Sequence, residues 1–338
     1  MLAERSGAIL TRIIEEYIEK AAPVPSQSIA AGAKLGVSPA TIRNEMSTLE
    51  EEGYIMRPHT SAGSVPTDKG YRHYVEALPH LSLSPAKQRL VSHLFHQVES
   101  DSERWLSLAA TVLAQMVKNM AVITVARPVK CKLKHLEIVA LQGSLALLLL
   151  VFDGARVKQR MVALETEVGQ AEMLIISNRL NAAYTGLTAS QIADAGLELS
   201  PAEKLITDQL TEMMQAEDKQ EDEEPRLDGL HFILSQPEFS HSQKIQSLME
   251  MVEQRSLLKI IPPAETKGPA VRVIIGRENS MEAIHDYSFV ISQYGLPDEA
   301  IGTISVIGPT RMRYSDTITS VNYLSTVLSK MVAGLFGR

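Results

Sequence analysis

The sequence has little of what an oxidising or membrane setting requires. Its 338 residues include a single cysteine, Cys131, which cannot form an internal disulfide and fits a reducing cytoplasm. The longest apolar run, Leu145 to Phe152, is far shorter than the roughly 20 residues that a membrane-spanning helix needs. The start, Met1 to Arg5, has no apolar signal-peptide core. These absences predict a cytoplasmic globular protein that does not enter a membrane.

Motifs for bond chemistry are also missing. The nine histidines and one cysteine show no metal-ligand spacing, and residues 93–96 (His-Leu-Phe-His) are typical of a helix face. Residues 307–310 (Ile-Gly-Pro-Thr) lack the Gly-x-x-x-x-Gly-Lys pattern of a phosphate loop. They predict a structural turn instead, with Arg311 and Arg313 packed nearby. Because neither a nucleophile elbow nor paired carboxylates are present, we expect no enzyme, no catalytic residues, no metal and no cofactor.

An excess of positive charge is a third absence, since the formal net charge is −7. Residues 217–224 hold six acids and one lysine, in a segment that we expect to be a solvated loop. Residues 1–75 hold eight Lys/Arg and nine Asp/Glu, so the N-terminal region is near neutral. Strong non-specific attraction to phosphates is therefore not expected. Binding to nucleic acid would depend on a few well-placed cations, helix N-termini and backbone amides.

The N-terminal region does have the element order of a winged helix. Helices are predicted over 7–21, 26–35 and 38–53, with Ser38 capping the third helix and Pro39 at its first position. A short strand at 54–57, a turn rich in Thr, Ser and Gly, and a second strand at Val65 follow. This order predicts a winged helix-turn-helix that binds double-stranded DNA.

The rest of the chain predicts an α+β fold. Strands are expected at 122–125, 133–141, 145–152, 157–164, 271–275, 288–293 and 302–307, and helices over 83–118, 172–261 and 316–336. The expected domains are a winged helix (1–80), a helical linker (81–118), an α/β domain (119–168 with 265–338) and a mainly helical insertion (169–264). Val122, Ile138 and Leu148 are candidates for the wall of a small-molecule pocket, although core packing is the simpler interpretation.

The third helix carries the candidate DNA-reading residues. Ile42, Met46 and Leu49 have helical spacing and are expected to face the core. On the opposite arc, Arg43 can reach a guanine edge or a phosphate, and Asn44 can pair with an adenine. The complete candidate set is Ser38, Ala40, Thr41, Arg43, Asn44 and Ser47 on the helix; Arg57, His59, Thr60, Ser61 and Ser64 on the wing; and Lys69 and Arg72 for DNA phosphates. An ordinary solvated helix followed by a polar loop is the alternative.

Several segments resemble the HrcA family of heat-inducible transcription repressors. The most distinctive of them is residues 58–71. The others are residues 9–17 with Pro23 and Val24, 37–44, 49–53, 276–279, 302–304 and 307–314. The chain departs from the family pattern where Ser64 replaces Arg, Gln27 replaces Lys, Pro25 replaces Gly and Glu45 replaces Asp. Two cations are lost, so we expect a weaker affinity or a shifted operator.

The resemblance implies a winged helix, a GAF-like domain and an inserted dimerisation domain. It implies homodimers on inverted-repeat operators upstream of chaperone operons, so that a two-fold protein faces a palindrome. It also implies that the GroEL chaperonin keeps the repressor active, and that heat releases repression when unfolded clients occupy GroEL. Two alternatives stay open: a repressor controlled by a small-molecule effector in the GAF-like domain, and a structural oligomerisation protein with a vestigial winged helix.

Overall fold

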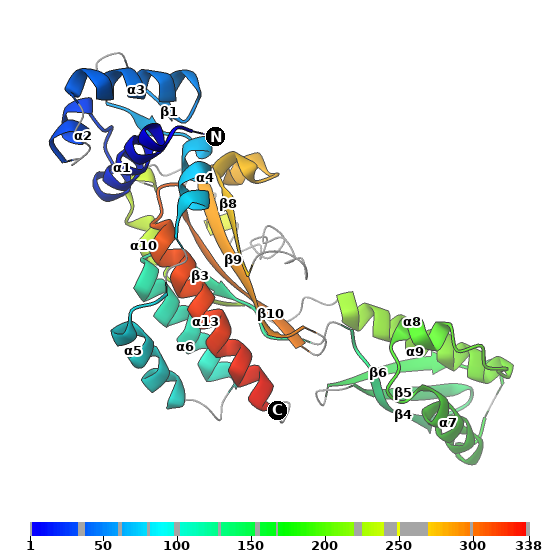
Figure 1. The fold of residues 1–338 in the computed structure, drawn as a ribbon. Coiled ribbons are helices and arrows are strands. Elements are labelled where there is room, and N and C mark those ends of the chain that lie inside the picture. The colour runs from blue at the N-terminus through cyan, green and yellow to red at the C-terminus, as the bar shows by residue number, and fades with distance from the viewer. Residues whose placement is uncertain are drawn as a thin grey trace. The chain divides into compact units, whose positions relative to one another are not determined.

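In the computed structural model the chain forms two compact units (Figure 1). The first unit is Met1–Arg127 with Glu224–Arg338, and the inserted unit is Pro128–Glu223. The residues that the structure describes are 2–32, 38–59, 63–79, 82–97, 102–127, 130–152, 156–166, 168–219, 225–239, 249–250, 270–297 and 300–335.

The first unit begins with a winged helix, as the sequence predicts. Its elements are α1 (Glu4–Lys20), α2 (Ser26–Gly32), α3 (Pro39–Glu51), β1 (Ile55–Met56), β2 (Val65–Pro66) and α4 (Asp68–Ala77). The apolar residues Ile9, Leu10, Ile13 and Ile14 recur at helical spacing and are fully buried, which fixes the inner face of α1. The helix ends where Ala21 adopts a left-handed conformation with φ 52°.

The remainder of the first unit is built on a five-stranded antiparallel sheet. Its strands lie in the order β7 (Arg226–Asp228), β3 (Met120–Ile123), β10 (Ala300–Pro309), β9 (Tyr287–Leu296) and β8 (Val271–Ile275). The helices are α5 (Pro85–His96), α6 (Ser102–Val117), α10 (Leu230–Leu234) and α13 (Tyr314–Leu335), with 3-10 turns η1 (Pro237–Phe239), η2 (Gly276–Glu278) and η3 (Glu282–Ile284). The segment 83–118, predicted to be helical, contains α5 and α6.

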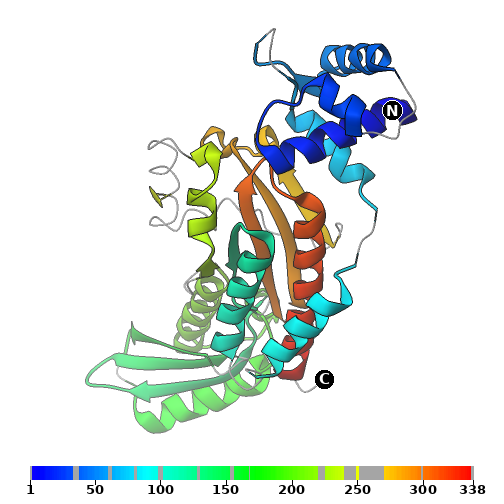
Figure 2. The same cartoon turned by 90° about the vertical axis from the view of Figure 1, so that its left-hand side faces the viewer.

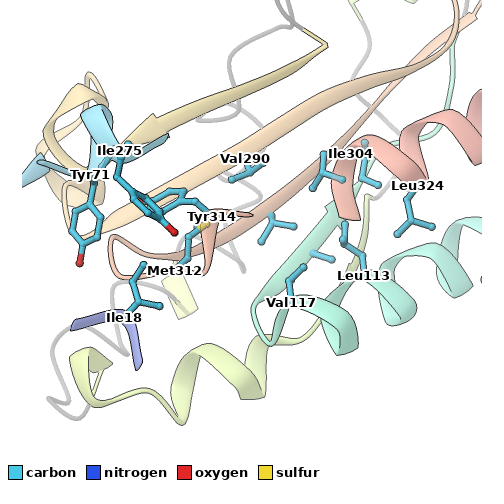
Figure 3. Packing of buried hydrophobic residues seen from close by; sticks show 14 of the residues in the cluster. Ile18, Tyr71, Leu113, Val117, Ile275, Val290, Ile304, Met312, Tyr314 and Leu324 are labelled. Atoms are coloured by element: carbon cyan, nitrogen blue, oxygen red, sulfur yellow. The ribbon is translucent and has the colours of Figure 1, made fainter. Parts of the chain in front are cut away.

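Both faces of this sheet are covered, which explains why all four residues of β3 are buried. Ala121 and Ile123 point into the core formed with α6 and α13, the two helices that cover one face (Figure 2). Figure 3 shows Leu113, Ile304 and Leu324 meeting in that core. Met120 and Val122 point to the other face, into a core that includes side chains from α10 and η1.

The inserted unit is a three-stranded antiparallel sheet with helices on one face. Its elements are β4 (Leu133–Ala140), β5 (Leu145–Phe152), β6 (Val157–Ala163), α7 (Gln170–Tyr184), α8 (Ala189–Ala193) and α9 (Pro201–Lys219). Burial alternates along β5, so that Leu148 and Leu150 are fully buried in one core with Leu180 of α7 and Leu210 of α9. This alternation is typical of a sheet with one buried face.

The opposite face of this sheet carries partly exposed apolar side chains, together with the polar residues His135, Glu137 and Gln159. Met161 of β6 lies opposite Leu147 of β5 and is 69% exposed, while Val157 lies opposite Val151 and is 58% exposed. We call this surface the open sheet face; its apolar members are Val139, Leu145, Leu147, Leu149, Val151, Val157 and Met161. Exposed apolar side chains on adjacent strands form a surface on which another protein could pack.

The structure corrects the expected division into domains. The segment 128–168 was expected to share a sheet with the C-terminal strands, yet β4, β5 and β6 pair only with one another and belong to the inserted unit. The insertion is therefore 128–223 instead of 169–264, and α6 packs on the sheet instead of serving as a linker. Periodicity identifies a strand but not its partner, because pairing is decided by contacts far apart in sequence. The short strand β7 was not predicted, and residues 251–264 lie outside the described residues.

None of the helices that the structure describes is both long enough and apolar enough to cross a membrane.

Candidate nucleic-acid interface

The candidate reading helix, α3, is fixed to the winged helix by its apolar face. Ile42, Met46 and Leu49 are between 0% and 2% exposed and pack in the same core as α1, which confirms their predicted role. The Ser38 side chain accepts a hydrogen bond from the Thr41 amide at 3.2 Å, so Ser38 caps the helix as expected. Because one face is buried, the other is held outward in a fixed orientation.

The outward face of α3 carries small and polar side chains. Ala40, Arg43 and Asn44 are exposed, and Ser47 is half-buried one turn further on. The Ser47 hydroxyl donates to the Arg43 carbonyl at 3.1 Å, which leaves its oxygen free to accept. A helix with a small residue in its first turn, a cation and an amide can lie deep in a major groove and read base edges.

Thr48 is an exposed neighbour of this face that the candidate set omits. Its hydroxyl donates to the Asn44 carbonyl at 3.2 Å, in the same way as that of Ser47. Its one-turn spacing from Asn44 was visible in the sequence. We therefore add Thr48 to the surface of α3 that can face DNA.

The wing presents two of its candidate residues on the surface. Arg57 is about one-third exposed and forms an ion pair with Glu50 at 3.3 Å, and His59 is exposed. The ion pair fixes the start of the wing turn beside the last turn of α3. Thr60 and Ser61 lie outside the described residues.

Ser64 does not belong to the wing surface, contrary to the prediction. Its side chain is 0% exposed, and its backbone pairs with Val24 through hydrogen bonds of 2.8 and 2.9 Å. Gly63 permits this close approach, since a Cβ there would lie 2.4 Å from the Val24 carbonyl carbon. The change from the family's Arg to Ser64 therefore affects the interior of the domain, not an exposed DNA contact.

Lys69 is exposed but already has partners within the winged helix. Its ammonium donates to the Glu52 carbonyl at 2.7 Å and lies 4.2 Å from the centre of the Tyr54 ring. A cation at this place satisfies a carbonyl at the C-terminal end of α3, where the helix dipole is negative. These contacts give Lys69 a structural role. To hold a phosphate as predicted, its ammonium would have to donate to the phosphate as well as to the Glu52 carbonyl.

Arg72 is the clearest error in the predicted set. Its guanidinium points away from α3, donating to both carboxylate oxygens of Glu278 and to the Val273 carbonyl at 2.8 Å. The hydrogen bond to Glu278 is the main reason that the pKa of Arg72 is raised above its usual value. Arg72 thus joins the winged helix to the sheet instead of holding DNA. Its partner is 206 residues away in sequence, so no local signal identified it.

The structural turn predicted after residue 307 is present. The Met312 amide donates to the Pro309 carbonyl at 3.0 Å, and Arg311 is packed against Glu238 and the end of α1. Arg313, by contrast, is exposed. The sequence predicted that Arg311 packs, but not that it contacts the winged helix.

The expected walls of a small-molecule pocket are core residues. Val122 is 1% exposed in a core of the first unit, and Ile138 and Leu148 are fully buried in the core of the inserted unit. They therefore cannot line one pocket within a single core. Among the residues that the structure describes, no cluster of three or more His, Cys, Asp and Glu side chains could hold a metal ion.

Comparison with known proteins connects this surface to a family. Residues 103–318 match the HrcA protein C terminal domain, and residues 12–67 match the DeoR-like helix-turn-helix domain. The heat-inducible transcription repressor HrcA of Dehalococcoides mccartyi is 50% identical over 338 residues, covering 100% of this chain and 98% of that protein. The repressor of the same name from Herpetosiphon aurantiacus is 36% identical, covering 100% and 97%.

A solved structure supports the fold over the whole chain. It is described as a hypothetical protein at 2.2 Å resolution, and it aligns with a TM-score of 0.59 over 98% of both chains. At 24% sequence identity, this likeness concerns the fold alone.

Proposed function

The chain belongs to the HrcA family of heat-inducible transcription repressors, and we propose that it represses by binding an inverted-repeat operator as a homodimer. It is a DNA-binding transcription repressor and not an enzyme, as the names of its full-length relatives and its helix-turn-helix domain indicate. The operator, the dimer and the chaperonin partner are proposals. We also propose that it acts in the cytoplasm, where its operator DNA would lie.

The observation that carries the operator proposal is the outward face of α3. Ala40, Arg43 and Asn44 stand exposed on a helix whose other face is buried, beside a wing that presents Arg57 and His59. Since residues 1–75 have almost no net charge, affinity depends on these individual contacts more than on general attraction to phosphates. We therefore expect strong preference for the operator over other DNA.

Dimer formation is supported by the open sheet face of the inserted unit. Seven apolar side chains on three adjacent strands would be covered when a second copy packs on them. Association through a self-complementary patch produces two-fold symmetry, which matches the symmetry of an inverted repeat. The name GAF-like for the five-stranded sheet of the first unit remains our interpretation.

We also propose that the GroEL chaperonin keeps the repressor active. Heat makes GroEL unavailable to the repressor when unfolded clients occupy the chaperonin. Chaperones bind apolar surface that a chain exposes, and Leu174 and Ile175 on α7 are 48% and 68% exposed. These residues lie on the helical side of the inserted unit and not on the open sheet face. They support a contact that does not compete with the dimer.

The test is an anisotropy titration of the full chain against the inverted repeat upstream of a chaperonin operon. A scrambled duplex is titrated in parallel, each at two salt concentrations and with and without chaperonin. Operator-selective binding that chaperonin improves supports the proposal. Equal, salt-sensitive binding to both duplexes would mean that the target has changed, and a dimer indifferent to DNA would favour a structural role.

A small-molecule effector is a second candidate, favoured by one cavity of the first unit. The cavity has a volume of about 440 Å³ and lies between the end of α1, the end of α6 and the start of α13. Its lining combines Phe232 and Met312 with the polar side chains Lys118, Gln236 and Arg313. Such volumes are typical of ligand pockets. Saturable metabolite binding that changes operator affinity without chaperonin would support this alternative.

A further inference from the structure

Two arginines connect the winged helix to the sheet of the first unit, and they do so in opposite directions. Arg72 extends from α4 of the winged helix to Glu278 and to the Val273 carbonyl at 2.8 Å. Arg311 extends from the turn after β10 to the Ile18 carbonyl at 2.7 Å, near the end of α1, while Glu238 holds its other nitrogens. We call the contacts of Arg72 and Arg311 between the winged helix and the sheet the joint. Each side of the joint donates hydrogen bonds from one guanidinium to the other side.

The contacts around Arg72 leave little room for movement. The Arg277 amide donates to Asp68 of α4 at 2.9 Å. Gly276, with φ 50°, lies so close that a Cβ there would be 2.4 Å from an Asp68 carboxylate oxygen. A larger residue would separate α4 from η2. The backbone of the sheet thus approaches the winged helix directly.

An aromatic contact fills the space between the two arginines. Tyr71 of α4 packs against Tyr314 at the start of α13, with ring centroids 5.8 Å apart, and both rings are buried. Figure 3 shows Tyr71, Tyr314, Met312 and Ile18 gathered at this end of the core. The joint therefore combines two guanidinium–carboxylate pairs with a buried aromatic contact. Together these hold the winged helix in one orientation relative to the sheet.

A fixed joint matters because operator half-sites are related by the geometry of DNA. One base pair of spacer moves a half-site by about 3.4 Å along the helix axis and by about one-tenth of a turn around it. Each joint that is rigid between α3 and the dimer contact narrows the range of half-site spacings that a dimer can bind without deforming the DNA. A dimer with loose winged helices binds several spacings with similar affinity.

We propose that Arg72 and Arg311 are positioning residues that fix α3 relative to the sheet and so select operators by the spacing of their half-sites. This inference rests on the proposed dimeric repressor. It assigns Glu278 and Glu238 to the same role, since each orients the guanidinium that it accepts from. The guanidinium donors of Arg72 and Arg311 are used within the protein, so the proposal assigns these four side chains no DNA contact.

The test measures affinity across a set of operators whose spacer is shortened or lengthened by one and two base pairs, together with a duplex that carries one half-site. The full chain is compared with the double variant Arg72→Ala and Arg311→Ala. We expect the unmodified protein to lose about tenfold or more in affinity two base pairs from its best spacing, because the DNA must be deformed. The double variant should vary by less than about threefold, with unchanged affinity for the single half-site.

Two control variants separate this role from a general loss of charge or fold. Arg12→Ala with Arg179→Ala removes two arginines that pair away from the joint, with Glu15 and Glu203, and should keep the selective profile. Arg72→Glu should flatten the profile, and adding Glu278→Arg should restore part of it. If the double alanine variant does not fold, a variant with Arg72→Lys and Arg311→Lys takes its place. It keeps both charges but loses the two-pronged guanidinium–carboxylate contacts, and its affinity should depend on spacing to an intermediate degree.

Three results would overturn the inference. In the first, the double variant keeps the original dependence of affinity on spacing. In the second, it loses as much affinity for the single half-site as for the operator, which would indicate a role in folding alone. It could also bind the native operator more tightly, which would make the joint inhibitory. An unmodified protein that binds the palindrome no better than one half-site would instead refute the proposed dimer, and this inference with it.

Discussion

At the scale of single residues, the proposed base recognition rests on a few exposed side chains of α3. Arg43 is exposed on a helix whose inner face is fully packed, so its removal leaves the core unchanged. Ser64 is the opposite case, since its hydroxyl is buried and has no partner among the described residues. Arg43 is therefore expected to affect operator binding, whereas Ser64 is expected to leave it unchanged.

Replacing Arg43 by alanine should weaken operator binding by about 1–3 kcal/mol if the guanidinium reads a base. Thermal stability should not change, because the side chain is exposed. Anisotropy titration against the operator measures the effect, with Arg12→Ala on the exposed face of α1 as the matched control. Unchanged operator affinity would remove Arg43 from the reading set.

Replacing Ser64 by alanine should leave operator affinity unchanged and should not lower the free energy of unfolding. A buried hydroxyl without a partner costs about 1–3 kcal/mol of desolvation, so its removal is neutral or stabilising. The comparison variant is Gly63→Ala, whose Cβ would clash with the Val24 backbone and should destabilise the wing. Urea denaturation measures both variants. Weaker operator binding by a stable Ser64→Ala protein would return this residue to the DNA surface.

Cys131 should react slowly with alkylating reagents while the protein is folded. Burial, and next Asp218, raise the pKa of its thiol from 9.0 to about 12. At pH 8 the folded thiol therefore holds about 1,000-fold less of the reactive thiolate than the unfolded one. The unfolded thiol ionises first, so this group's contribution to stability is complete below pH 9 and is lost as the pH rises toward 12. Iodoacetamide labelling at pH 8, with and without urea, checks this; equal rates would contradict it.

Residues with local constraints were predictable, and residues with distant partners were not. Ile42, Met46 and Leu49 followed from helical spacing, and the Ser38 cap followed from its place before Pro39. The prediction for Arg72 was wrong because its hydrogen-bond partner, Glu278, is 206 residues away in sequence. A cation after a wing has the same local pattern whether it faces DNA or another part of the protein. Only the tertiary structure distinguishes these cases.

At the scale of elements, α3 depends on its first turn for its outward orientation. The Ser38 hydroxyl lies 3.0 Å from that of Thr41 and also accepts from its amide. The cap satisfies an amide that the helix itself cannot satisfy. It therefore stabilises the first turn of α3, the part that we propose to lie in the groove.

Ser38→Ala should destabilise α3 by about 0.5–2 kcal/mol, and Ser38→Asn should retain most of the stability because asparagine also caps. Hydrogen exchange of the amides in residues 38–51 measures the effect locally. Faster exchange in the alanine variant alone would show that Ser38 acts as a cap. Equal exchange in all three proteins, combined with weaker operator binding by both variants, would assign Ser38 to direct DNA contact.

Strand positions were predictable, but their assembly into sheets was not. Residues 145–152 and 157–164 matched β5 and β6 to within one residue, because alternation and turn residues are local signals. Both strands belong to a sheet of their own and not to the sheet with β9 and β10. Each strand that the structure describes has an apolar residue on at least one face, so polarity alone does not identify its partner.

At the scale of the whole molecule, the surfaces proposed for DNA reading and for association belong to different units. The first unit holds α3, and the inserted unit holds the open sheet face. A change on the open sheet face should therefore alter association without altering the winged helix. The two functions can be tested independently.

Met161→Glu should dissociate the proposed dimer, because it places a charge on the open sheet face, on the edge strand β6 and opposite Leu147. Sedimentation velocity measures the association state, and affinity for a single half-site should remain. The matched control is Ile175→Glu, which puts the same charge on an exposed apolar residue of α7, on the helical side of the unit. Dissociation by the control and not by Met161→Glu would move the interface to α7.

The place where the inserted unit joins the chain has an evolutionary consequence. β3 and β7 flank the insertion and pair with each other, with Ile123 opposite Arg226. The 96-residue unit thus occupies the position of an ordinary hairpin loop, and a short turn could replace it without breaking the ladder. A lineage could exchange this module for another and acquire a new quaternary arrangement while its regulon stayed the same.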